Sequence, residues 1–198
     1  MFKNATAFKQ NISFWDVSKV SNFTQYGYAS NHADPYFTGS NAHYFYIKER
    51  PFTNTDLPDA VSAWISNSTT ATANYGNIND WNTSEVTNME NLFQNRNTFN
   101  SNISDWDTSK VTNMRGMFWG AGPFNQPLNN WNISKVANIG VMLSGTNFNR
   151  PLNNWNTSKV TNMRSLIYGV NCGSPCEYPF SSINPDITHW DVSNVTNM

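Results

Sequence analysis

The sequence has little charge and no long apolar segment. Charged residues make up 13% of the 198 residues, and the formal net charge is -1. This balance leaves no long-range positive field of the kind that attracts nucleic acid or anionic membranes. No run of about 18 apolar residues is present to span a bilayer. We therefore expect no nucleic-acid partner and no membrane insertion in this segment.

Cysteine is also scarce: the chain has only Cys172 and Cys176, separated by three residues in the stretch NCGSPCEYP. Two interpretations stay open for them, a small local disulfide or two free thiols in a loop. A metal site would need two more ligands, and His32, His43 and His189 fall at no ligand-like spacing. The sequence therefore predicts no metal and no cofactor.

What the sequence does contain is an internal repeat anchored on tryptophan. Its central copies follow one another every 24 or 25 residues, a period typical of proteins whose units stack. We expect the tryptophans to form a core between stacked units. The copies read WDVSKVSNF, WNTSEVTNM, WDTSKVTNM, WNISKVANI, WNTSKVTNM and WDVSNVTNM, and they begin at Trp15, Trp81, Trp106, Trp131, Trp155 and Trp190.

Each unit divides into two parts with different periodicity. The part before Trp is short and contains Pro127 or Pro151 in two copies, which predicts an extended segment. From Ser109 onward, apolar residues recur at steps of three and four, which predicts a short helical turn. A single unit buries too little apolar surface to offset the entropy of ordering its residues, at about 1 to 2 kcal/mol each. The units are therefore predicted to stack as an α/β repeat solenoid of short strands and short helical turns.

An asparagine recurs between the apolar Val and Met of each copy. A buried amide there without a partner would cost about 1 to 3 kcal/mol, so we predict a ladder in which this side chain bonds the neighbouring backbone. The alternative is an asparagine that faces solvent or caps a helix. The residues are Asn22, Asn88, Asn113, Asn138, Asn162 and Asn197.

The repeat is interrupted twice, which divides the chain. An amphipathic helix in TDLPDAVSAWISNS precedes the regular array and is expected to cap it. Of the many NxS and NxT triplets, Asn67 beside that helix and Asn4 are the glycosylation candidates. The expected parts are residues 1–26 as the end of a first array, 27–55 as an aromatic-rich connector, 56–74 as the capping helix and linker, and 75–198 as a second array with a Cys-containing loop near 170–184.

An enzyme would need acid, base or nucleophilic groups that converge, and none is evident. Asp105 and Asp107 flank Trp106, but the position after Trp alternates between Asp and Asn along the repeats. That exchange suits a side chain that bonds its local backbone and not a required carboxylate. The sequence therefore predicts no enzyme and no catalytic residue.

The repeated residues resemble the BspA-like leucine-rich-repeat surface proteins, whose units look like FNQxLxxWDTSxVTNMxxMFxxA. Residues 1–26 and 75–198 carry the resemblance, and LPDAVSAWIS followed by YGNINDW resembles the segment that often opens such arrays. The resemblance implies a right-handed, leucine-rich-repeat-like coil of about 25 residues in a secreted or surface-anchored protein, with adhesion as the activity of some members. It carries over no catalytic residue.

These features lead to two functional expectations for a protein outside the cell or on a particle surface. The first is a non-enzymatic protein whose solenoid face binds protein or carbohydrate, with the connector aromatics as contact residues or as packing between arrays. The second is a structural building block of a surface appendage, cell covering or virus exterior, whose partners are copies of itself. The first residues, MFKNATAFKQ, lack the order of a secretion signal, so we expect the signal and anchor to lie outside this segment.

Overall fold

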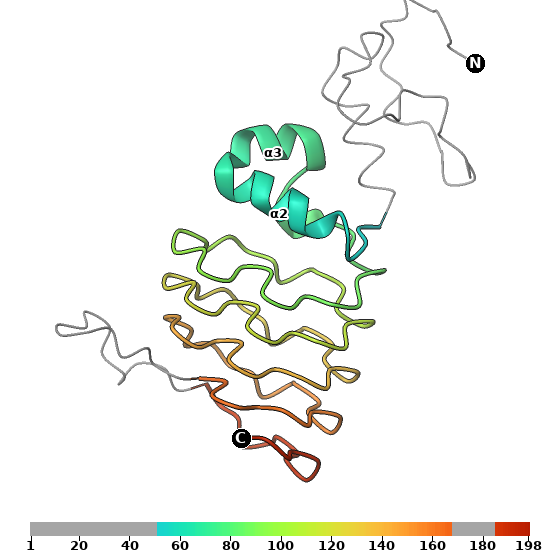
Figure 1. Cartoon of the computed structure of the whole chain (residues 1–198), viewed down its shortest axis with the longest axis vertical. Helices are drawn as coiled ribbons and strands as arrows, with labels where there is room; N and C mark the ends of the chain where they lie inside the picture. Colours follow the sequence, from blue (N-terminus) through green and yellow to red (C-terminus); the bar gives the residue numbers. More distant parts are fainter. Residues whose placement is uncertain (1–50, 168–184) are drawn as a thin grey trace, which may run out of the picture.

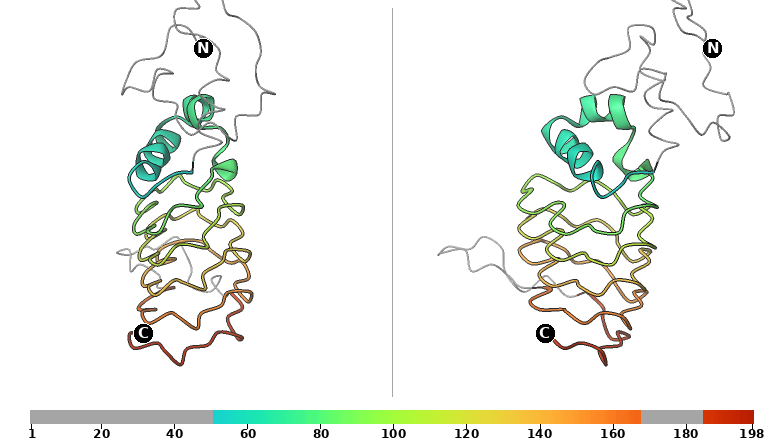
Figure 2. Two further views of the ribbon diagram at one scale, coloured as in Figure 1. Left: turned by 90° about the vertical axis from the view of Figure 1, so that its right-hand side faces the viewer. Right: turned by 45° about the vertical axis from the view of Figure 1, so that its right-hand side comes forward.

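The computed structural model describes residues 51–167 and 185–198. In this part of the chain two helices lie on one end of a stack of coils, and the chain then descends coil by coil (Figure 1). Two further views show the coils one above the other from other sides (Figure 2). A capped stack is therefore the frame on which any surface site is built.

The cap consists of α2 (Leu57–Ser66) and α3 (Ser68–Tyr75). The sequence predicts α2, with a proline in its first turn. It does not predict α3, which occupies the expected linker. The Oδ1 atom of Asn67 accepts the N–H of Thr70 at 3.0 Å, and this N-cap starts α3 where propensity alone gave no signal. Gly76, with φ of 76°, ends α3.

The cap supplies aromatic rings to the first coil, which has no coil above it among the described residues. Trp81 contacts Phe52 with ring centres 5.0 Å apart, Tyr75 at 5.9 Å and Trp64 edge-on at 6.0 Å. On its other side Trp81 stacks on Trp106 at 6.2 Å. The cap thus gives the first tryptophan the aromatic contacts that later coils receive from each other.

The predicted α/β solenoid is wrong about the elements within a coil. Outside α2, α3 and the short 3-10 helix η1 (Ile78–Asp80), the described residues form no helix and no strand. The extended segment before Trp is not a strand, and the stretch from Ser109 is not helical. Only isolated parallel bridges join successive coils. The leucine-rich-repeat-like class, which needs those strands and helical turns, is overturned for the part of the chain described.

Hydrogen bonds between coils explain why no helix forms. From Gly116 to Ala121, every second N–H donates to a carbonyl of the next coil, and those between donate three residues back. Gly116 N–H reaches Gly140 O at 2.9 Å, whereas Met117 N–H reaches Met114 O at 3.2 Å. A helix needs each N–H to bond four residues back in its own segment. The three-residue turns produce the same apolar spacing as a helix, which is why periodicity alone misled.

The core runs through the stack as columns of aromatic rings. Phe118 is fully buried and stacks on Phe93 of the coil above with ring centres 5.4 Å apart. It also stacks on Phe124 at 3.9 Å, and Phe124 continues to Phe148 at 6.3 Å. Each ring therefore packs against rings of its own coil and of a neighbouring coil, so that the coils stabilise one another.

Ten positions after its Trp, each coil turns at a residue whose backbone is in the left-handed conformation. This position holds Asn91, Gly116, Val141 and Ser165 in successive coils, with φ between 49° and 61°. Glycine and asparagine tolerate this conformation, whereas a β-branched residue is strained there. Val141, with φ of 52°, is therefore the strained member of the row.

We expect Val141→Asn to stabilise the chain. Asparagine enters the left-handed region at lower cost than valine, so the free energy of unfolding should rise by about 1 kcal/mol. Urea denaturation followed by tryptophan fluorescence measures the change. Val141→Thr is the matched control, because threonine keeps the branch at Cβ and should give no gain. A gain from threonine as large as that from asparagine would show that strain is not the cause.

Candidate functional site

The repeated tryptophans lie between coils and tie each coil to the one before it. Trp81, Trp106, Trp131 and Trp155 are each 3% exposed. The indole N–H of Trp106 donates to Ile78 O at 2.7 Å, across to the preceding coil. The equivalent bonds link Trp131 to Ile103, Trp155 to Leu128 and Trp190 to Leu152. The rings of Trp81, Trp106, Trp131 and Trp155 are therefore interior, whereas Trp190 is half-buried; Trp15 lies outside the described residues.

The asparagines between Val and Met align coil on coil through their backbone. Parallel bridges connect each to the next, and Met89 N–H donates to Asn113 O at 2.9 Å. The side-chain oxygen turns back to its own coil, since Asn138 Oδ1 accepts Gly140 N–H at 3.0 Å, whereas Asn113 Nδ2 donates across coils to Glu90 Oε2 at 3.0 Å. The sequence predicts bonds from these side chains to the neighbouring backbone, whereas the main chain forms the backbone bonds across coils here. The bridged residues are Asn88, Asn113, Asn138, Asn162 and Asn197; Asn22 lies outside the described residues.

Directly after each Trp stands an Asn or Asp that closes a turn, which we call the turn row. Its Oδ1 accepts the N–H of the serine two residues on, at 2.9 to 3.2 Å. The prediction that this Asp/Asn exchange reflects a bond to local backbone is confirmed. Hydrogen bonds from Ser109 hold the pKa of the Asp107 carboxyl below its ordinary value, and the charges of Lys110 and Lys135 act in the same direction. The turn row is Asn82, Asp107, Asn132, Asn156 and Asp191.

Buried threonines fix the backbone of the turn row as well. Thr83 Oγ1 donates to Asp107 O at 3.0 Å, and Thr108 Oγ1 donates to Asn132 O at 3.1 Å, each from the preceding coil. Both threonines are at most 1% exposed. Because the main chain and one side-chain oxygen are both held at Asp107 and Asn132, the remaining polar atom of each of these two residues is fixed in direction.

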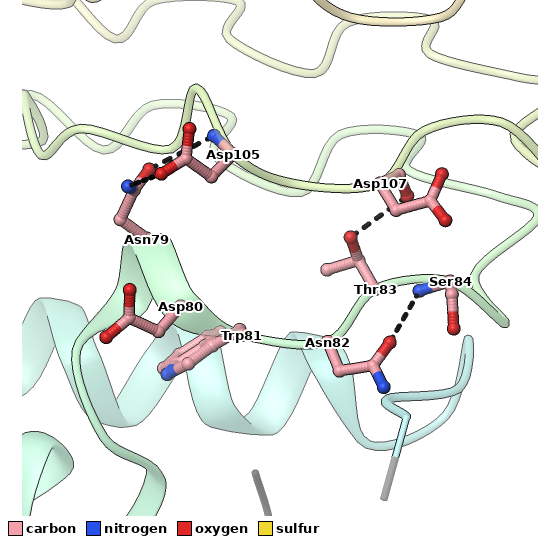
Figure 3. A pocket seen from close by; sticks show the side chains of 8 residues that line it. All are labelled: Asn79, Asp80, Trp81, Asn82, Thr83, Ser84, Asp105 and Asp107. Carbon is pink, nitrogen blue, oxygen red and sulfur yellow. Dashed lines mark hydrogen bonds between the residues drawn. The ribbon is translucent and has the colours of Figure 1, made fainter. Parts of the chain in front are cut away.

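A polar hollow of about 420 Å³ opens between the first two coils (Figure 3). Bonds across the coils close it on both sides. On one side Asn79 Nδ2 donates to Asp105 Oδ2 at 2.6 Å, and on the other Thr83 bonds Asp107 O. Its lining residues are Asn79, Asp80, Trp81, Asn82, Thr83, Ser84, Asp105 and Asp107.

A second hollow of about 350 Å³ lies two coils further along at equivalent positions. Asn129 stands two residues before Trp131, as Asn79 stands before Trp81, and its Nδ2 donates to Asn153 Oδ1 at 2.9 Å. The first hollow carries carboxylates, whereas the second carries amides at the matching places. Its lining residues are Asn129, Asn130, Trp131, Asn132, Ile133, Asn154 and Asn156.

A protein-family model described as "Mycoplasma protein of unknown function, DUF285" matches residues 1–35, 60–174 and 177–198. The chain belongs to the DUF285 family. The match takes in the repeats and agrees with a repeat protein of a surface. A search of curated proteins and a search of solved structures each found no match. The description of DUF285 names no activity, so the chemistry of the hollows is argued from their residues.

The hollows of this DUF285 chain are suited to hydrogen bonding. Over residues 51–167 and 185–198, no three His, Cys, Asp or Glu side chains gather as ligands for a metal ion. Asp105 is already bonded to Asn79, and the Asp107 carboxyl accepts from Ser109. In the described ranges no helix is long and apolar enough to cross a bilayer. What the geometry offers is a row of oriented amides, carboxylates and hydroxyls.

The remaining candidate residues of this DUF285 chain lie apart from the hollows. Asn67 is exposed between α2 and α3, and its described bond uses Oδ1, which leaves the nitrogen that a glycan would occupy. Asn4, Cys172 and Cys176 lie outside the described residues. Sequence reasoning missed Asn129, Asn130 and Asn154, which line the second hollow. The sequence signal that could have found them was the recurrence of a polar residue at the same distance before and after the repeated Trp.

Proposed function

We propose that this chain is a non-enzymatic repeat protein of an extracellular or particle surface, which binds a protein or carbohydrate partner along the hollows. The observation that carries this proposal is the recurrence of one polar hollow at equivalent positions of different coils. A stack with equivalent sites suits an extended partner, because each coil repeats the contact of the one before. The resemblance to BspA-like surface proteins supports the same location and an adhesive role.

The polar atoms of the second hollow are positioned before any ligand arrives. Asn132 Oδ1 accepts from the N–H and hydroxyl of Ser134, and Asn156 Oδ1 does the same with Ser158. Each amide nitrogen is therefore free to donate outward in a fixed direction. Donors held in place lose little entropy on binding, which favours affinity for a polar ligand.

We expect Asn132→Asp with Asn156→Asp to weaken binding without loss of the fold. Aspartate forms the same turn at Asp107 and Asp191, so the Oδ1 bond survives while the outward NH2 donor becomes a carboxylate. Affinity for the partner should fall by about tenfold or more, since each lost hydrogen bond leaves a group unpaired. A glycan array and a panel of surface proteins identify the partner of the unmodified chain, and titration compares the variant.

The control is Asn97→Asp with Asn147→Asp, which adds the same charge at two exposed residues in another turn of the unit. This control should bind as the unmodified chain does. Equal binding by both double variants would contradict a role for the hollows. Failure to bind any glycan or protein, with a periodic assembly in electron micrographs, would favour the structural building block instead.

A further inference from the structure

A column of charged residues runs beside the turn row, four positions after each Trp. It holds Glu85, Lys110, Lys135 and Lys159 in successive coils. Lys110 Nζ is 2.5 Å from Glu85 Oε1, so the first two members neutralise each other. Within the described ranges, Lys135 and Lys159 have no ion pair. Two unpaired positive charges therefore remain on neighbouring coils.

This arrangement is unfavourable for the isolated chain. Coils joined by parallel bridges are about 4.7 to 4.9 Å apart, and like charges on adjacent rungs repel. Both lysines are exposed, so packing does not require them. The repulsion would be relieved by a ligand that brings negative charge along the direction of the stack.

The lysine column faces the turn row and not a separate surface. The charges of Lys110 and Lys135 both act on the carboxyl of Asp107, which belongs to the turn row. Because the coils stack in the same way throughout, Lys159 has the corresponding position next to Asn132. Lysine ammonium groups and turn-row side chains thus border one strip of surface.

The chemistry of this strip changes along the stack. Near the cap, the strip carries the carboxylates of Asp105 and Asp107. Farther along, Asn132 and Asn156 use their oxygens in turns and present only NH2 donors, next to Lys135 and Lys159. This distal strip lies between the carboxylates of Asp107 and Asp191 and itself offers amide donors and positive charge, which select a ligand rich in acceptors and negative charge.

We propose that this distal strip binds a linear anionic polysaccharide, with its carboxylate or sulfate groups at Lys135 and Lys159 and its hydroxyls at the amides of Asn132 and Asn156. The inference rests on the proposed function, because it names the class of ligand for the same surface. In a linear polysaccharide linked across the sugar ring, the length of one sugar unit along the polymer is comparable to the spacing between successive coils. A polymer with one charge per sugar therefore matches a stack with one lysine per coil.

Nucleic acid fits the strip less well. A DNA strand carries one charge about every 3.4 Å, which is closer than the coils. Proteins that bind single strands stack bases on exposed aromatic rings, whereas Trp131 and Trp155 are each 3% exposed. The chain also has a net charge of -1, which gives no general attraction for nucleic acid. An acidic polysaccharide needs neither aromatic stacking nor a strong overall field.

The test measures binding of the full chain to oligogalacturonate, dextran sulfate and uncharged dextran at several salt concentrations. The unmodified chain should bind one or both anionic glycans and not dextran, with affinity that falls as salt rises. Lys135→Gln with Lys159→Gln should weaken binding by about tenfold or more and reduce the salt slope by about 2. The better of the two glycans tells whether carboxylate or sulfate is preferred.

The charge-matched control is Arg96→Gln with Arg150→Gln, which removes two positive charges at other positions of the unit and should bind as the unmodified chain does. Lys135→Glu with Lys159→Glu should abolish binding while circular dichroism and melting show a folded chain. Unchanged binding in the double glutamine variant, or tighter binding to polyglutamate or single-stranded DNA, would overturn the inference. Binding to an uncharged glycan alone would overturn it but leave the proposed function intact. If no glycan or protein binds, both fail.

Discussion

Phe118→Ala should destabilise the stack by about 3 to 5 kcal/mol, because it removes a fully buried ring and leaves a cavity. The loss should be at the upper end of this range, since the ring stacks on Phe93, Phe124 and Trp131. Those contacts join successive coils, so the substitution also weakens coupling between the parts above and below. Urea unfolding followed by circular dichroism gives the change in free energy and in slope.

Trp119→Ala is the matched control for Phe118→Ala. Trp119 is the next residue, it is also a large aromatic, and it is 37% exposed. Its truncation should cost within about 0.5 kcal/mol, as expected of a surface substitution away from special features. If Trp119→Ala were as destabilising as Phe118→Ala, the column of stacked rings would not be the source of stability.

Gly116→Ala should destabilise the chain by about 2 to 4 kcal/mol, from two causes that act together. The residue has φ of +61°, where an alanine is strained by about 1 to 2 kcal/mol. An added Cβ would also overlap the Oδ1 of Asn91 in the coil above, and overpacking costs about 1 to 3 kcal/mol. The Asn91 oxygen is the end of a side chain and has no hydrogen-bond partner, so it can shift without breaking a bond, and the cost of overpacking should lie at the lower end of that range. A shift in the urea midpoint measures the loss.

Gly122→Ala controls for the loss of glycine alone. This glycine is outside the left-handed region, and an added Cβ would meet nothing within 4 Å. Alanine there should leave stability unchanged or raise it by about 0.4 to 1 kcal/mol, through the unfolded chain. Equal destabilisation by both alanines would argue against the close contact between Gly116 and Asn91 as the cause.

The sequence predicted the residues of the core better than the elements that hold them. Recurrence assigned Trp106 to the interior, and Trp106 is buried. Recurrence reports which face is apolar. It does not distinguish a helix from a chain of three-residue turns, because both bring residues three and four apart to one side. The deciding information is where each N–H donates, and these donors reach carbonyls about 24 residues away.

The candidate site was harder to predict for a related reason. Asn129 and Asn79 stand at the same offset from Trp, but Ser104 replaces them in the coil between, so the position does not read as a repeat. The charge difference between Asp107 and Asn132 looked like neutral exchange within the repeat. Only stacking shows that these exchanges place the amides of Asn132 and Asn156, beside Lys135 and Lys159, between the carboxylates of Asp107 and Asp191.

The one-residue difference in period tells how such a chain can change length. Trp131 and Trp155 are 24 residues apart, and the missing residue falls in the turn between Thr146 and Phe148, whereas Ala121 and Phe124 are three apart. The hydrogen bonds between coils on either side of this turn are kept. The loss of one residue in the turn therefore does not disturb the stacking. A deletion between Trp and the bridged Asn would instead shift the register of the parallel bridges that join this coil to its neighbours. Natural variants should therefore gain or lose whole coils, or single residues in this turn. Each added coil would lengthen the proposed binding strip by one coil, so that, if the strip binds a long polymer, avidity would increase in steps of one repeat.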